Sequence, residues 1–127
     1  MEPSGVAIAP ALEYIRTAYA VTFPMDHLAA LCHMSPTHFR RIFREQTSLA
    51  PIAFLNRTRI LESCTLLRTT GMSIAEIAGA VGFTTLSSYN RHFSEVTGCS
   101  PSAWRQLANV PSRQTVIGYS GWTEAEG

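Results

Sequence analysis

Two segments fifty residues apart decide the fold: PTHFRRIFREQT over residues 36–47 and LSSYNRHFSEVT over residues 86–97. They share a motif, and the prolines that follow them share the same spacing: Arg41-x-Phe43-x-Glu45-x-Thr47 with Pro51, and Arg91-x-Phe93-x-Glu95-x-Thr97 with Pro101. Upstream the register slips by one residue, because Leu28-Ala29 answers Ile77-Ala78. Each copy is therefore predicted to be a short helix, a turn that absorbs the extra residue, and a second helix, which is the helix-turn-helix arrangement.

The predicted turns contain the residue types that tight turns need. Ala78 lies four residues before Gly82, where glycine accepts a positive φ that a side chain disfavours. In the first copy Ala29 is matched, but His33 takes the place of the glycine. Histidine is among the residues enriched at positive φ, so the turn is expected in both copies.

The rest of the chain predicts an all-α fold of about seven helices, because apolar residues recur at helical spacing almost throughout. Ser35-Pro36 and Ser100-Pro101 are N-cap and first-turn pairs, and Ser73 with Glu76 is a capping box. A long connecting helix is expected from Pro51 to about Thr69, ended by Gly71. The predicted segments are a flexible N-terminus (1–8), a first helix-turn-helix subdomain (9–49), the connecting helix (50–70), a second subdomain (71–108) and a C-terminal tail (109–127).

The chain has 127 residues and ten arginines, but no lysine, and nine acidic residues leave a net charge of +1. Three acids lie at the extreme ends, so residues 3–123 hold ten arginines against six acids, a balance of about +4. This length excludes a large catalytic barrel, and no apolar run approaches the roughly 20 residues that span a bilayer. The odd number of cysteines, Cys32, Cys64 and Cys99, indicates reduced core thiols in an intracellular protein.

The second helix of each copy has an apolar face and a polar face. Phe39, Ile42, Phe43 and Gln46 are expected to face inward in the first copy, and Tyr89, Phe93 and Val96 in the second. The outward stripes are Thr37, Arg40, Arg41 and Arg44, and Ser87, Asn90, Arg91 and Ser94. Such side chains can pair with guanine, adenine and phosphates in a major groove. The ordinary alternative is a solvated face, with Arg41–Glu45 and Arg91–Glu95 as surface ion pairs.

Residues 12 to 105 resemble the DNA-binding domain of the AraC/XylS transcription regulators. The resemblance is carried in the first half by Leu28-Ala29, Ser35, Arg41-x-Phe43, Arg59-Ile60 and Leu66-Leu67. In the second half it is carried by Ile74-Ala75-Glu76-Ile77-Ala78, Gly82-Phe83, Ser87, Arg91-x-Phe93, Gly98-x-Ser100-Pro101 and Arg105. It implies that helices 36–46 and 85–97 enter successive major grooves. A connecting helix of 19 residues would be roughly 28 Å long, comparable with the ~34 Å between neighbouring grooves.

The resemblance also implies roles for individual residues. Base edges would be read by Thr37, Arg40, Arg41, Leu86, Ser87, Ser88 and Arg91, to which the outward stripe adds Asn90. Phosphates would be bound by Ser35, His38, Arg44, Thr85 and Ser94, with a plain surface histidine as the alternative for His38. The family pattern gives Arg59 a structural role.

The leading hypothesis is a bacterial domain that binds double-stranded DNA sequence-specifically and acts as an activator or repressor. Its expected partners are operator DNA and RNA polymerase, with an effector or dimerisation domain outside this chain, and its expected location is the cytoplasm, at the nucleoid. The alternative is a helical interaction module that binds an acidic protein. An enzyme is not predicted, because no nucleophile, base and orienter cluster together. No cofactor or metal is predicted either, since the four histidines have no metal-ligand spacing.

Overall fold

The computed structural model describes residues 7–109, and within them the chain is all α-helical, as predicted. Seven helices are present in this part: α2 (Ala9–Ala18), α3 (Met25–Leu31), α4 (Pro36–Thr47), α5 (Pro51–Thr69), α6 (Ile74–Ala80), α7 (Leu86–Thr97) and α8 (Pro101–Ala108). Residues 1–6 and 110–127, which hold most of the predicted terminal segments, lie outside the described residues. None of the described helices combines the length and the hydropathy that crossing a membrane requires.

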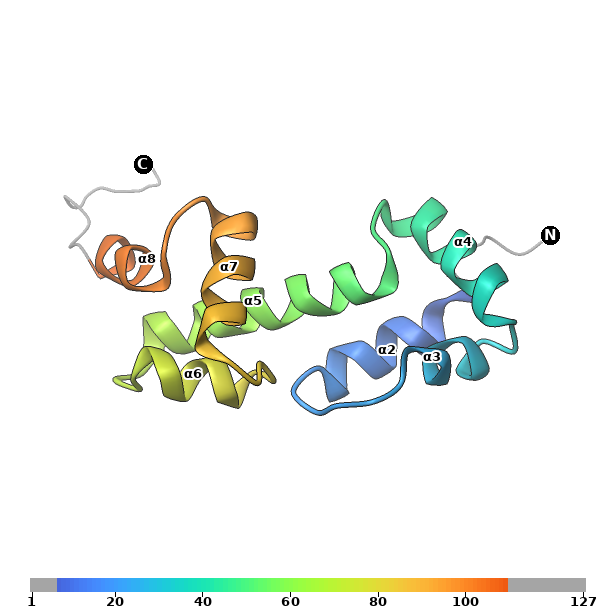
Figure 1. The fold of residues 1–127 in the computed structure, drawn as a ribbon, viewed down its shortest axis with the longest axis horizontal. Helices are drawn as coiled ribbons and strands as arrows, with labels where there is room; N and C mark the ends of the chain where they lie inside the picture. Colours follow the sequence, from blue (N-terminus) through green and yellow to red (C-terminus); the bar gives the residue numbers. More distant parts are fainter. Residues whose placement is uncertain (1–6, 110–127) are drawn as a thin grey trace.

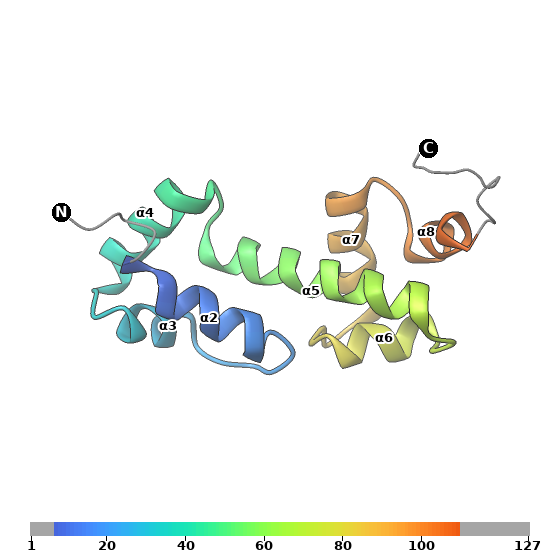
Figure 2. The same ribbon diagram turned by 180° about the vertical axis from the view of Figure 1, so that it is seen from behind.

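Helix α5 is the axis of the molecule (Figure 1). Helices α2, α3 and α4 gather at its N-terminal end, and α6, α7 and α8 gather at its C-terminal end. In both Figure 1 and the view from behind in Figure 2, α4 and α7 reach above α5, while α2, α3 and α6 lie below it. The two repeat copies therefore present their second helices on the same side of the axis.

The two turns have the same backbone hydrogen bonds. Ala29 O accepts from Met34 N at 3.0 Å, and Ala78 O accepts from Phe83 N at 2.9 Å. The residue in the turn has a positive φ in both copies, 57° at His33 and 108° at Gly82. Histidine thus adopts the left-handed conformation that the sequence comparison requires of it.

The second helices begin and end alike. Ser35 caps α4 and Thr85 caps α7, each accepting from a backbone N–H three residues on. Ser48 and Gly98 end these helices with φ of 70° and 86°. The hydroxyls of Thr47 and Thr97 each donate to the carbonyl four residues back at 2.9 Å, which explains the repeated threonine. The residue inserted in the second copy is Thr84, between the turn and the cap.

Each half of the molecule has its own hydrophobic core. The N-terminal core is built on Phe39 and Phe43, with Phe54 edge-on to Phe43 at 5.3 Å between ring centroids. The C-terminal core repeats this with Tyr89 and Phe93, and Trp104 packs on Phe93 at 6.3 Å. Aromatic pairs of this geometry add to the stability gained from burial alone.

Three details differ from the sequence-based expectation. Ile8 is only 1% exposed and packs in the N-terminal core, although it falls in the segment expected to be flexible. Helix α5 does not end on a left-handed glycine, because its C-cap is Thr70 in extended backbone, whose hydroxyl donates to Leu66 O at 2.7 Å. Gln46 is exposed rather than inward-facing, since the half-buried position of that last turn is taken by Thr47.

Candidate nucleic-acid interface

Helix α4 separates its residues cleanly into a buried and an exposed face. Phe39 and Phe43 are 1% and 0% exposed. The opposite face carries residues that are all exposed: Thr37, Arg40, Arg41 and Arg44. The proline at the start of the helix and the Ser35 cap fix the first turn, so Thr37 and His38 stand at the N-terminal end of the exposed face.

Helix α7 repeats this division with fewer charges. Tyr89 and Phe93 are fully buried, and the exposed residues are Leu86, Ser87, Asn90, Arg91, Ser94 and Glu95. Leu86 exposes 44% of its surface. Ser88 is the exception among the predicted base readers, because it is half-buried and lies against His92.

The arginines of the two exposed faces differ in their partners. Arg41 pairs with Glu45 at 3.2 Å and also contacts Nδ1 of His38 at 2.9 Å. Arg91 pairs with Glu95 at 3.7 Å. Arg40 and Arg44 form no ion pair with the described residues. Exposed pairs of this kind contribute only about 0.3–0.5 kcal/mol, so Arg41 and Arg91 can exchange their partners for another anion at small cost.

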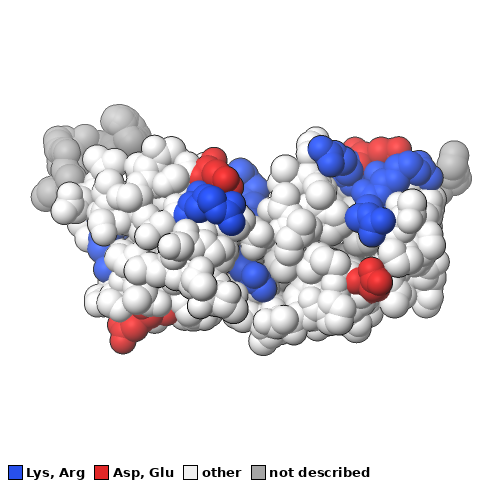
Figure 3. Space-filling model, in the orientation of Figure 1, with Lys and Arg blue, Asp and Glu red and all other residues white. Residues whose placement is uncertain are grey.

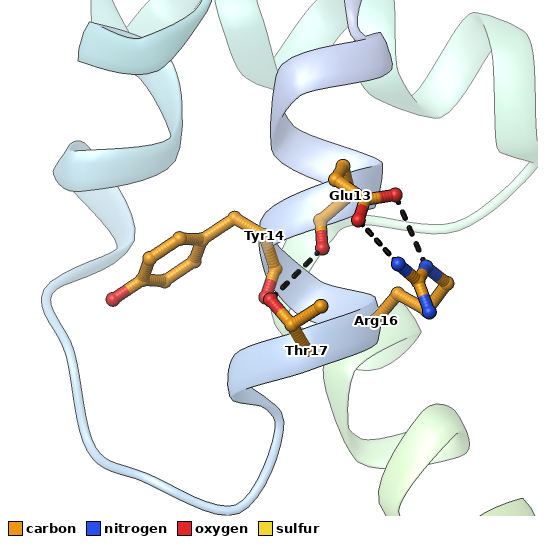
Figure 4. A network of polar contacts seen from close by, with 4 residues as sticks. All are labelled: Glu13, Tyr14, Arg16 and Thr17. Carbon is orange, nitrogen blue, oxygen red and sulfur yellow. Dashed lines mark hydrogen bonds and ion pairs between the residues drawn. The ribbon is translucent and has the colours of Figure 1, made fainter.

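Basic and acidic side chains lie side by side on the face drawn in Figure 3. Basic side chains gather over α4 and beside the upper part of α7, with acidic ones next to them. The third ion pair among residues 7–109, Arg16 with Glu13, lies on α2, where the Thr17 hydroxyl also bonds to the backbone (Figure 4). This pair lies outside the exposed faces of α4 and α7, so its variants can serve as controls for variants of the other two pairs.

Three of the five predicted phosphate-binding residues, Ser35, His38 and Thr85, lie at the starts of α4 and α7. Ser35 Oγ accepts from His38 N at 3.2 Å, and Thr85 Oγ1 accepts from Ser88 N at 3.1 Å. Both hydroxyls keep a proton that can be donated to an outside acceptor. Ser94 lies further along α7 and donates to Cys99 O at 3.4 Å. Arg44 lies in the last turn of α4, two turns from Thr37.

Sequence reasoning missed a polar pair that joins α7 to α5. Asn56 on α5 bonds to Nε2 of His92 on α7 at 3.2 Å, and Nδ1 of His92 lies 2.9 Å from Ser88 O. A carbonyl only accepts, so Nδ1 carries the proton and Nε2 accepts from the Asn56 amide. Residues 36 positions apart give no local sequence signal, so only the packing of α7 on α5 reveals this pair.

Sequence reasoning also missed how Arg105 fastens α8. Its guanidinium donates to Leu67 O at 3.0 Å and to Thr70 O at 3.2 Å. These carbonyls belong to the last turn of α5, where helical partners are missing. The residue was part of the family resemblance, but its helix-capping role was not foreseen.

Two helix-turn-helix units of equal construction, each with a polar exposed second helix, define the chain as a helix-turn-helix protein. A family model described as a helix-turn-helix domain matches residues 28–107. The chain belongs to this family, in its AraC type, whose members are DNA-binding transcription regulators of bacteria.

Curated relatives are regulators considerably longer than this chain. The MmsAB operon regulatory protein of Pseudomonas aeruginosa is 34% identical over 93 residues, which are 73% of this chain and 30% of that protein. The transcriptional activator RhaR of Cronobacter sakazakii is 31% identical over 86 residues, 68% of this chain and 30% of that protein. The chain thus spans about a third of the length of these relatives.

Solved structures agree on the fold. The DNA-binding domain of the global transcriptional factor AdpA, solved in complex with a target DNA, is 34% identical, with a TM-score of 0.69 over 84% of this chain and 93% of that one. An AraC-type regulator from Chromobacterium violaceum matches with a TM-score of 0.79 over 86% of this chain and 97% of that one, at 19% identity.

Proposed function

We propose that α4 and α7 bind two successive major grooves on one face of a DNA duplex and read its sequence for a bacterial transcription regulator. The observation that carries this proposal is the repeated division of α4 and α7 into a buried aromatic face and an exposed polar face, on the same side of α5. A polar helix face with arginine and hydroxyl side chains can contact base edges and phosphates together.

Within this proposal the two units read their grooves with different chemistry. Arg40 and Arg41 each supply a fork that fits guanine O6 and N7, with Thr37 beside them. On α7, Ser87, Asn90 and Arg91 supply hydrogen bonds, and Leu86 supplies an apolar contact that suits a thymine methyl. Ser88 contributes less, because it is half-buried against His92. Ser35, His38, Arg44, Thr85 and Ser94 hold the phosphates and fix the register.

The proposal extends to the division of the chain and to the whole regulator. Residues 9–49 and 71–108 form two subdomains, with the connecting helix between them. In the regulator as a whole, we assign RNA polymerase as a partner, a separate domain to effector binding or dimerisation, and a place in the cytoplasm at the nucleoid. The relative AdaA of Bacillus subtilis is a bifunctional transcriptional activator and DNA repair enzyme, of which this chain spans 46%. To the present chain we assign DNA binding without catalysis.

The experiment compares arginine variants by fluorescence anisotropy on duplexes selected for binding and on random duplexes. Arg40→Ala and Arg41→Ala are each expected to cost about 1–3 kcal/mol on the selected duplex and to relax base preference at one position. Arg44→Ala should weaken binding to all sequences alike and reduce the salt slope by about one. Arg68→Ala, on the exposed last turn of α5, is the matched control and should change neither.

Binding that is insensitive to salt on random DNA would contradict the proposal and favour an acidic protein partner. If Arg40→Ala and Arg41→Ala both keep the affinity and the base preference of the unaltered chain, these two residues do not contact bases.

A further inference from the structure

The two helix-turn-helix units meet at a half-buried arginine, Arg59, halfway along the connecting helix. Arg59 donates from Nε to Tyr19 O at 2.6 Å and from Nη2 to Val21 O at 3.2 Å. Both carbonyls belong to the segment that follows α2 in the first unit. The arginine therefore ties α5 to the first unit through backbone atoms that no side-chain substitution can remove.

The same guanidinium also contacts the turn of the second unit. Its central carbon lies 5.8 Å from the centroid of the Phe83 ring, a cation–π distance. A Cβ built on Gly82 would lie 2.9 Å from Nε of Arg59 and 3.1 Å from Ala20 O. The turn therefore fits against the guanidinium only because residue 82 has no side chain.

Tyr19 joins the two units by a second route. Its side chain packs against the buried residues of both hydrophobic cores. Its carbonyl accepts the shorter of the two Arg59 hydrogen bonds. We call Tyr19, Ala20, Val21, Arg59, Gly82 and Phe83 the junction.

The partial burial of Arg59 at the junction has a desolvation cost that its contacts must offset. Loss of solvent lowers the pKa of the Arg59 guanidinium. A partly desolvated charge is tolerated when it is hydrogen-bonded, and here the two carbonyls accept from two of its N–H groups. Arg57, two residues earlier on the same helix, is exposed and lacks this environment. A planar fork can bond two carbonyls while stacking on a ring, which an ammonium cannot do.

We infer that Arg59 is a positioning residue that fixes the distance and rotation between α4 and α7, and so sets the spacing of the two base sequences that the chain reads. This inference rests on the proposed function, because spacing matters only if both helices bind one duplex. One base pair inserted between the two sequences increases their separation by ~3.4 Å and rotates one relative to the other by about 34°. A rigid junction cannot follow that change, whereas a loosened junction can.

The test uses Arg59→Met, which keeps an apolar stem on Phe83 and removes both hydrogen bonds. Arg68→Met, with the same substitution on the exposed end of α5, controls for the lost charge. Affinities are measured for the selected duplex, for a duplex holding only the sequence bound by α4, and for duplexes with one base pair inserted or removed between the two sequences.

The unaltered chain and Arg68→Met are expected to lose at least about tenfold in affinity on the altered spacings. Arg59→Met should bind the selected duplex about tenfold more weakly, match the unaltered chain within about twofold on the single sequence, and lose less than about threefold on altered spacing. Arg59→Lys keeps the charge without the fork and should lie between them, which preserves the test if Arg59→Met fails to fold.

A distance measurement without DNA separates this inference from the proposed function. Spin labels at positions 37 and 87, attached through unnatural ketone residues that spare the native cysteines, should give one narrow distance in the unaltered chain. The distribution should become at least about twofold broader in Arg59→Met. An unchanged distribution, or an equal loss of affinity on the single sequence and the full duplex, would overturn the role of Arg59. An unaltered chain indifferent to spacing would overturn two-groove reading instead.

Discussion

At the scale of single residues, the acidic partners of the exposed arginines are expected to affect DNA affinity most directly. Glu45 holds Arg41 in an ion pair in which both side chains are more than half exposed. A carboxylate on a face that approaches phosphates also repels them. If Arg41 binds DNA as proposed, Glu45 competes with DNA for Arg41 and also opposes the approach of DNA.

Glu45→Gln is accordingly expected to raise affinity for DNA by about two- to tenfold at 0.1 M salt, and by less at higher salt, since screening weakens both effects. Anisotropy titrations measure the change. Glu13→Gln is the matched control, because Glu13 also pairs with an exposed arginine, Arg16, but on α2. Equal gains from the two variants would show that only net charge matters and that α4 has no special place in binding.

At the scale of elements, a buried hydrogen bond joins α7 to the connecting helix. Tyr89 donates from its hydroxyl to Ser63 Oγ at 2.9 Å, and Ser63 donates to Ile60 O at 2.7 Å. Both side chains are 0% exposed. This pair helps to fix the packing of α7 on α5, so its loss should lower the free energy of unfolding.

Tyr89→Phe should lower the free energy of unfolding by about 1 kcal/mol, and Ser63→Ala by about 1–3 kcal/mol, since the latter leaves a buried hydroxyl without an acceptor. The double variant should cost less than the sum, because both changes remove one bond. Urea unfolding measures these values. Tyr14→Phe is the control within ±0.5 kcal/mol, since the Tyr14 hydroxyl bonds to none of residues 7–109. Additive costs in the double variant would rule out the coupling.

The helices themselves could be predicted from the sequence because their signals are local. Ser35-Pro36, Ser100-Pro101 and the Ser73–Glu76 box each fix a helix start within four residues, and all three are present in the structure. The division of α4 and α7 into two faces follows from helical periodicity, except in the last turn, where Gln46 is exposed.

What could not be predicted depends on residues distant in sequence. The Arg59 bonds span 40 and 38 residues, the Asn56–His92 bond spans 36, and the Arg105 bonds span 38 and 35. Only the way in which α2, α7 and α8 pack on α5 brings these groups together. The same packing half-buries Ser88, which the family resemblance placed among the base readers.

At the scale of the whole molecule, the near-neutral net charge conceals an uneven distribution of arginines over the surface. The charge of +1 is the balance of ten arginines and nine acids. Four of the arginines are exposed on α4 and α7, and two of these lie beside Glu45 and Glu95. Because α4 and α7 lie on the same side of α5 (Figure 1), the proposed function makes the distance between these two helices part of DNA recognition. Affinity for DNA then depends on both base sequences and on the distance between them.

The most direct measurement of this central claim is selection of bound duplexes from a random pool by the 127-residue chain, followed by sequencing. We predict two enriched blocks whose centres lie about 10–10.5 base pairs apart, at a single spacing. A single enriched block, or two blocks at freely varying distances, would contradict reading of two successive major grooves by α4 and α7.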